Sequence, residues 1–175
     1  MRKLAILSAV LFALSIPAVA QDSPKAEIFG GVSYMNAKLF PVEHGVGFQA
    51  SASGNFTEHF GLTADFGGHF RSVAGVDFQT FQYMVGPRAV ARNERATGFV
   101  HALFGVAQVR VDTPLGSSSV AKFAMGFGGG VDLNINDRVA FRAGQVDYIP
   151  ALDANEDWRH NIRVGVGFVI KLGQQ

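Results

Sequence analysis

The chain has 175 residues, of which 48% are apolar and 17% are charged, with 21 Gly and no Cys. The absence of Cys excludes a disulfide framework and a lipid anchor on cysteine, and it leaves His and carboxylates as the available metal ligands. Without the first 20 residues, 13 Lys and Arg stand against 14 Asp and Glu, so the formal charge is −1 and nucleic-acid binding is disfavoured. The length suits a single domain.

The first 20 residues have the pattern of a cleavable signal peptide. A positively charged start is followed by the uncharged, apolar residues 4–16 and by an A-x-A cleavage sequence at 18–20. We therefore expect residues 1–20 to be removed and Gln21 to be the mature N-terminus. Residues 21–175 would then form one exported domain.

Eight segments of the mature chain alternate with period two, the pattern of a β-strand whose faces meet different surroundings. One face carries large apolar residues, and the other carries Gly, Ala, Ser or charged residues. In the last segment, Val164 and Phe168 alternate with Arg163 and Gly165. The expected strands, in chain order, are 26–36, 46–56, 60–71, 78–90, 97–110, 121–133, 138–149 and 161–172.

The alternation is imperfect in several of these segments. Residues 97–110 and 138–149 are apolar and strand-like but are expected to change phase. In the second of them, Arg142 and Asp147 can share a face only if a β-bulge lies near Gly144. Phe29 and Pro87 also interrupt the pattern in their strands.

The connections between the expected strands alternate in length. Short polar turns are expected at 57–59, 91–96 and 134–137, and mostly longer loops at 37–45, 72–77, 111–120 and 150–160. The strands are close to the roughly 9 to 11 residues that a tilted strand needs to cross a bilayer. The sequence therefore predicts an all-β protein, an eight-stranded antiparallel up-and-down transmembrane barrel with both termini in the periplasm. Aromatic girdles are expected near the turns at Phe56, Phe60 and Phe99, and near the loops at Tyr34, Phe70, Phe78 and Tyr148.

The two faces of the strands then correspond to lipid and lumen. Eight strands enclose only enough space for side chains, which explains the many small residues on the lumen face. Charges of both signs share that face and should pair there, because an unpaired buried charge is costly. We expect a structural charge network that plugs the lumen, and the sequence does not determine which acid pairs with which arginine. The network is formed by Glu27, Asp65, Arg88, Asp132, Arg142 and Arg163.

The chain resembles the small outer-membrane β-barrels of the OmpA/OmpX and opacity-protein type over about all of residues 21–175. The resemblance rests on the segments 29–34, 85–88, 104–107, 128–132 and 139–148. It implies the outer membrane of a Gram-negative-type bacterium, with membrane lipid as the surroundings. The last strand also resembles the signal read by the barrel-assembly machinery, matched by Arg163, Gly165, Phe168 and Ile170, although the chain ends on Gln175 instead of an aromatic residue.

Catalytic and metal chemistry have weak support in the sequence. His101 lacks a nucleophile because Leu103 stands where a His-x-Ser pair would need serine. His69 and Asp65 lie too far apart along a strand, about 13 Å, to act as a pair. His44, Glu43 and His160 lack ligand spacing. We therefore expect no enzyme activity, no metal and no cofactor.

The expected role is structural or surface-interacting, for a monomer whose outer loops face the surroundings. Trp158 and the acidic loop at 150–160 are the expected contact with a surface ligand. Two alternatives remain open at this point. The first is a narrow porin-like channel, and the second is a soluble periplasmic lipocalin-like binder, which would need its large apolar residues inside.

Overall fold

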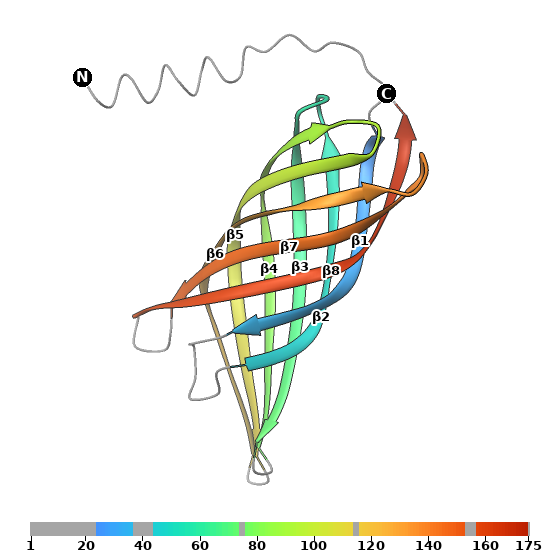
Figure 1. The fold of residues 1–175 in the computed structure, drawn as a ribbon. Helices are drawn as coiled ribbons and strands as arrows, with labels where there is room; N and C mark the ends of the chain where they lie inside the picture. Colours follow the sequence, from blue (N-terminus) through green and yellow to red (C-terminus); the bar gives the residue numbers. More distant parts are fainter. Residues whose placement is uncertain (1–23, 37–43, 74–75, 114–115, 153–156, 175) are drawn as a thin grey trace, which may run out of the picture.

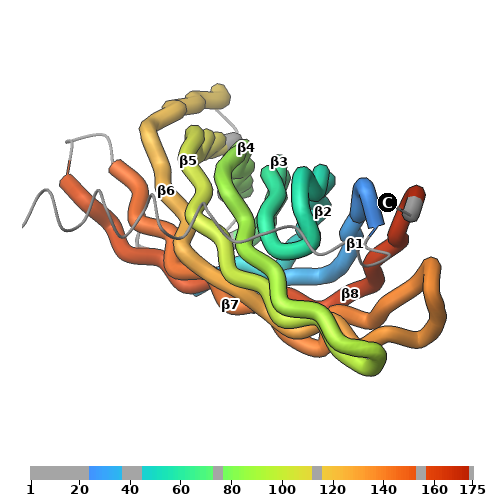
Figure 2. The backbone as a smooth tube through the Cα atoms, turned by 90° about the horizontal axis from the view of Figure 1, so that it is seen from above, coloured from blue at the N-terminus to red at the C-terminus, as the bar shows by residue number. Residues whose placement is uncertain are grey.

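The computed structural model describes residues 24–36, 44–73, 76–113, 116–152 and 157–174, and the expected signal peptide and residues 153–156 of the expected last loop lie outside these ranges. The eight strands form one closed antiparallel barrel in which each strand pairs with its neighbours in sequence and β1 pairs with β8. Figure 2 shows β1 and β8 side by side where the barrel closes. The strands are β1 Pro24–Asn36, β2 His44–Asn55, β3 Phe60–Val73, β4 Val76–Arg92, β5 Ala96–Thr113, β6 Gly116–Asn134, β7 Val139–Leu152 and β8 Trp158–Gln174.

The structure confirms the predicted fold, an eight-stranded antiparallel barrel with short turns at the end where β1 begins and β8 ends (Figure 1). The residues of these strands alternate with period two because one face of each strand contacts lipid and the other lines a narrow lumen. Large apolar side chains point outward, and Val32, Phe168 and Ile170 are 63%, 57% and 50% exposed. Within the described ranges, no helix is long and apolar enough to cross a bilayer.

The outward position of the large apolar residues excludes the lipocalin-like alternative. A soluble barrel buries such residues inside and presents polar residues to water. Here the lumen holds the polar residues instead, and Gln49, Gln82 and Gln145 are each 1% exposed. Lipid is therefore the medium that the outer surface requires.

The bulge expected near Gly144 is present, and the phase change expected in 97–110 is absent. The register of β7 shifts between Arg142 and Gln145 against β8, and Val131 pairs with Gly144 before Asp132 pairs with Arg142. One extra residue therefore lets Arg142 and Asp147 both point into the lumen. In contrast, β5 keeps one register against β6 along its whole length.

The unbroken register of β5 corrects the girdle position that was expected for Phe99. The expected girdle position would place its ring at the membrane surface, but Phe99 is only 5% exposed and points into the lumen. Phe29 is likewise buried in the lumen at 2% exposure. Both rings pack against guanidinium groups there, which explains why large apolar residues occupy the lumen face.

The connections at the outer end are also different from those expected. The segments 72–77 and 111–120 were expected as loops, but nearly all their residues continue the strands as two long hairpins. Figure 1 shows the ends of β3 to β6 reaching beyond those of β1, β2, β7 and β8. Because β4, β5 and β6 have 17, 18 and 19 residues, they exceed the roughly 9 to 11 residues needed to cross the membrane.

Polarity on the outward face shows where the hairpins leave the lipid. The last large apolar residues facing outward on these strands are Phe70, Phe81, Val106 and Phe123, and their positions form one level of the barrel wall. Beyond that level, the described outward positions are polar on all four strands except for Ala121 on β6. They include Ser72, Asp77, Gln79, Gln108, Arg110 and Ser119.

Candidate functional site

The lumen is the candidate functional site because it gathers most of the buried charge of the described chain. The strand register places four carboxylates and four guanidinium groups on the inner wall. All eight are buried or nearly so, and Arg92, the most accessible, has a side chain that is 14% exposed. The carboxylates are Glu27, Asp65, Asp132 and Asp147, and the guanidinium groups are Arg88, Arg92, Arg142 and Arg163.

At the end of the barrel with the short turns, Glu27 joins β1 to β4 across the lumen. Its Oε2 atom accepts a hydrogen bond of 2.6 Å from Arg88 Nη1, and its Oε1 atom accepts one of 2.7 Å from Arg92 Nη2. Asn55 Nδ2 donates to the same carboxylate at 3.2 Å. Arg92 also donates to the backbone carbonyl of Glu58. This group ties the turn between β2 and β3 to the lumen.

In the next level, Arg142 and Asp132 form a bidentate ion pair. The Nε and Nη2 atoms of Arg142 donate to the two carboxylate oxygens of Asp132 at 2.7 and 3.0 Å. Arg142 Nη1 donates to Gln145 Oε1 at 2.7 Å. Arg88 Nη2 lies 3.9 Å from Asp132 Oδ2, so this pair and the Glu27 group are in electrostatic contact.

Two aromatic rings enclose this pair of arginines. The guanidinium carbon of Arg142 lies 4.1 Å from the ring centre of Phe29 and 4.2 Å from that of Phe99. The guanidinium carbon of Arg88 lies 4.6 Å from the Phe99 ring centre. Cation–π attraction of this kind is strongest in a desolvated site. The rings therefore fix the arginines and fill the lumen at once.

At mid-barrel, Arg163 bridges two acidic residues from different strands. Its Nη2 atom lies 2.8 Å from Asp65 Oδ1 and 2.7 Å from Asp147 Oδ2. Asp147 Oδ1 lies 2.9 Å from His101 Nε2, and Gln49 Nε2 donates to Asp65 Oδ2 at 2.7 Å. Arg163 is fully buried, at 0% exposure, so every polar partner it has is supplied by the protein.

Toward the outer end, part of the inner wall is apolar. Buried apolar side chains form two clusters in the lumen, one of larger side chains and one of alanines alone. Beside them, Ser33 Oγ lies 2.9 Å from His69 Nε2. This part of the lumen therefore combines apolar clusters on β4 to β7 with buried polar side chains, among them Gln82 and Asn161. The clusters are Met84, Leu103 and Ile149, then Ala107, Ala124 and Ala151.

The charged levels leave little free space. A cavity between them is bounded mostly by polar and charged side chains of β2 to β5 and β7, among them Ser51, Thr63 and Arg142, and has no room for a water molecule. Gly residues allow this close packing. A Cβ on Gly128 would lie 2.1 Å from Asp147 Oδ1, and one on Gly67 would lie 2.8 Å from Arg163 Nη1.

All six residues predicted for the charge network lie in the lumen, and the structure brings them together in three ion-paired groups. Asp147, Arg92 and His101 also belong to this network, although they are not among the six predicted residues. Asp147 could have been found from the bulge at Gly144, which puts it in phase with Arg142. His101 follows from the unbroken alternation of β5, since Thr97 and Phe99 also point inward.

The other residues singled out in the sequence lie elsewhere. Trp158 begins β8, at 44% exposure, with its ring edge-on to Phe123 at 6.5 Å between centres, so it belongs to the barrel wall and not to a loop tip. On β8, Arg163 and Gly165 face the lumen, whereas Phe168 and Ile170 face outward. The strand continues past Ile170 because residues up to Gln174 still pair with β1.

The described residues show no assembled metal site. No group of three or more His and acidic side chains within the described ranges is placed to hold a metal ion. Glu43 lies outside those ranges. The ring of His160 stacks on Tyr148 with 5.7 Å between centres, and its Nδ1 atom is hydrogen-bonded to the tyrosine hydroxyl.

A family model for the outer membrane protein beta-barrel domain matches residues 6–169. The chain belongs to this family. Membership places the protein in the outer membrane of Gram-negative bacteria, as the lipid-facing surface requires. No curated protein sequence matches the chain closely enough to count as a relative.

Solved structures of small outer-membrane barrels share the fold. Neisserial surface protein A (NspA) superposes with a TM-score of 0.71 at 13% identity, covering 87% of this chain and 100% of that one. Ail, the attachment invasion locus protein of Yersinia pestis, gives 0.58 at 16% identity, with 84% and 99% covered. The N-terminal barrel domain of Pseudomonas aeruginosa OprF gives 0.54 at 11% identity, with 85% and 99% covered.

Proposed function

We propose that this protein is a closed outer-membrane barrel with a structural and surface-interaction role, which neither conducts ions nor catalyses a reaction. The observation that carries the proposal is the set of ion pairs that crosses the lumen. Four carboxylates and four guanidinium groups compensate one another there, and the cavity between them has no room for water. Permeation would require these ion pairs to separate inside a water-poor lumen, at a cost of several kcal/mol for each ion.

The outer hairpins support the surface-interaction part of the proposal. The ends of β3–β4 and β5–β6 are polar on their outward face beyond the lipid-facing level, so they stand in the aqueous surroundings of the cell. Ail, which shares the fold, has been solved in complex with the heparin analogue sucrose octasulfate. We propose that this protein likewise contacts a surface ligand through its outer end.

Planar bilayer recordings separate the closed barrel from a narrow channel. We expect a silent bilayer with the wild-type protein and also with Arg88→Ala, because Glu27 keeps Arg92 and Asp132 keeps Arg142 when Arg88 is removed. Conductance of the wild-type protein that changes with Arg88→Ala would establish the channel and refute the plug.

Cell adhesion assays test the contact with the surroundings. Replacing the outer residues of the β3–β4 and β5–β6 hairpins, or the segment 150–160, with Gly and Ser should reduce adhesion of cells that display the barrel. A matched replacement in the periplasmic turn at 93–95 should leave adhesion unchanged. Equal adhesion of all variants would refute the surface role while leaving the closed barrel untouched.

We also propose that residues 1–20 are removed during export and that the last strand is read by the barrel-assembly machinery through Arg163, Gly165, Phe168 and Ile170. The protein would then work as a monomer beginning at Gln21. Intact mass of the protein from outer membranes tests the cleavage, and any other N-terminus would refute it. Phe168→Ser should lower the amount of folded barrel in the outer membrane if the signal acts as proposed.

A further inference from the structure

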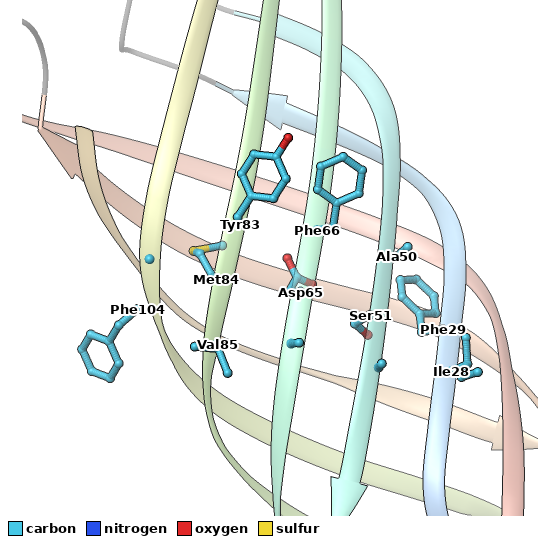
Figure 3. A pocket seen from close by; sticks show the side chains of 13 residues that line it. Ile28, Phe29, Ala50, Ser51, Asp65, Phe66, Tyr83, Met84, Val85 and Phe104 are labelled. Carbon is cyan, nitrogen blue, oxygen red and sulfur yellow. The ribbon is translucent and has the colours of Figure 1, made fainter. Parts of the chain in front are cut away.

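A groove crosses the lipid-facing surface of β1 to β5 (Figure 3). It encloses about 590 Å³, and its floor is formed by small outward side chains on β2 and β3. One continuous row of paired residues runs across it from strand to strand, in the order Ile28, Ala52, Ala64, Val85 and Phe104. The large members of the row therefore stand at the ends, and the alanines form the depression between them.

The lining of the groove is hydrocarbon. Three of its lining residues carry polar groups: Ser51, Asp65 and Tyr83. Ser51 and Asp65 are buried on the lumen side of the wall, at 9% and 4% exposure. Asp65 is held there by Arg163. A headgroup, a sugar or a charged peptide would find no polar partner on the floor of this groove. Its occupant must be an apolar chain.

Aromatic rings close the groove on its outer side. Phe48, Phe66, Phe70 and Phe81 form a contiguous cluster, with ring centres 5.4 Å apart for Phe48–Phe66, 6.2 Å for Phe66–Phe81 and 5.8 Å for Phe70–Phe81. Gly68 is covered by two of these rings, because a Cβ there would lie 2.7 Å from the Phe48 ring and 3.3 Å from the Phe81 ring. A chain cannot enter between these rings.

The periplasmic side of the groove is open. Gly54 follows Ala52 on the same face of β2 toward the turn at 56–59, and a Cβ built on it meets nothing within 4 Å. Gly54 pairs with Ala26 on β1, which is also small. The depression therefore continues past Ala52 toward the periplasmic end of the barrel.

We propose that this groove holds one acyl chain of a phospholipid from the periplasmic leaflet of the outer membrane. The volume is that of a site for one small ligand, commonly about 300 to 1,000 Å³. A second barrel would need a contact of roughly 1,000 Å² or more with complementary shape, whereas this groove is a local depression between large side chains. The groove is also continuous with the lipid-facing surface, so acyl chains are the molecules in contact with it.

Native mass spectrometry of the protein extracted from outer membranes in a mild detergent tests the proposal. The variant Ala52→Phe/Ala64→Phe fills the floor, and Val146→Phe/Val164→Phe is the matched control, since these paired residues face lipid on β7 and β8. We expect one phospholipid per chain on the wild type and on the control. On the filled variant, the lipid-bound fraction should fall about tenfold, equivalent to about 1.4 kcal/mol.

Four results would overturn the proposal. They are a wild type without a retained lipid, an equal lipid-bound fraction on the filled and control variants, an adduct with the mass of lipopolysaccharide, or a dimer that only the filled variant loses. Gel mobility of each variant in detergent, before and after boiling, shows which variants fold, because a folded barrel migrates differently until it is boiled. If the double Phe variant does not fold, Ala52→Leu is used, and an unchanged lipid-bound fraction for that variant also overturns the proposal.

Discussion

Replacing Arg163 with Met tests whether the lumen network stabilises the barrel. Arg163 is fully buried, and its removal leaves Asp65 and Asp147 without the guanidinium that lies 2.8 and 2.7 Å from them. Breaking a buried ion pair by removing one partner costs about 3–5 kcal/mol, because an uncompensated charge remains. Asp65 then keeps the hydrogen bond from Gln49, which supplies no positive charge, and Asp147 keeps its contacts with Gln145 and His101. We expect a loss of about 3–5 kcal/mol in the free energy of unfolding.

The assay is urea unfolding in phospholipid vesicles, followed by the fluorescence of Trp158, the only tryptophan in the chain. Trp158 lies on the barrel wall and reports its transfer from lipid to water. Arg95→Met, in the exposed turn between β4 and β5, is the control and should change stability by less than about 0.5 kcal/mol.

A charge-compensated variant separates an uncompensated charge from a packing defect. Arg163→Met/Asp65→Asn/Asp147→Asn removes the guanidinium and both carboxylates it contacts, so most of the lost stability should return. The reasoning is wrong if Arg163→Met unfolds within about 1 kcal/mol of the wild type, or if the triple variant is less stable than the single one.

Three further predictions concern the packing of the lumen. Gly128→Ala should destabilise the barrel by about 1–3 kcal/mol in the same unfolding assay, because the added Cβ would lie 2.1 Å from Asp147 Oδ1. Its control is Gly98→Ala, which should be nearly neutral because a Cβ at Gly98 meets nothing within 4 Å. Phe99→Leu should cost more than Phe104→Leu, because Phe99 contacts two guanidinium groups and Phe104 faces lipid, and equal losses would contradict the lumen position of Phe99. Refolded wild-type barrel should migrate differently in detergent gels before and after boiling, and identical mobility would contradict a stable closed barrel.

The residues themselves were enough to predict the strands and their two faces. Successive side chains of a strand point to opposite faces, so the residue types along the chain indicate what each face contacts. In β8, Val164 and Phe168 alternate with Arg163 and Gly165, which indicates lipid on one face and a narrow lumen on the other. The bulge at Gly144 was predictable because two charged residues, Arg142 and Asp147, had to share one face.

The errors arose where a local pattern allows two arrangements. Phe99 fits a girdle or a cation–π partner equally well in sequence, and only the register of β5 against β6 places it between Arg88 and Arg142. The polar segments at 72–77 and 111–120 fit a loop or a protruding hairpin, since both faces of a strand outside the membrane can be polar.

The sequence by itself determined the number of strands, the outward position of the large apolar residues and the six charges of the lumen. These features depend on residue type and spacing along one strand. Only the tertiary structure decided that Arg163 pairs with Asp65 and Asp147, that Glu27 holds Arg88 and Arg92, and that the lipid-facing alanines form a groove. Such contacts join strands that are far apart in the chain, and their geometry depends on the stagger of the closed barrel, which no single strand contains.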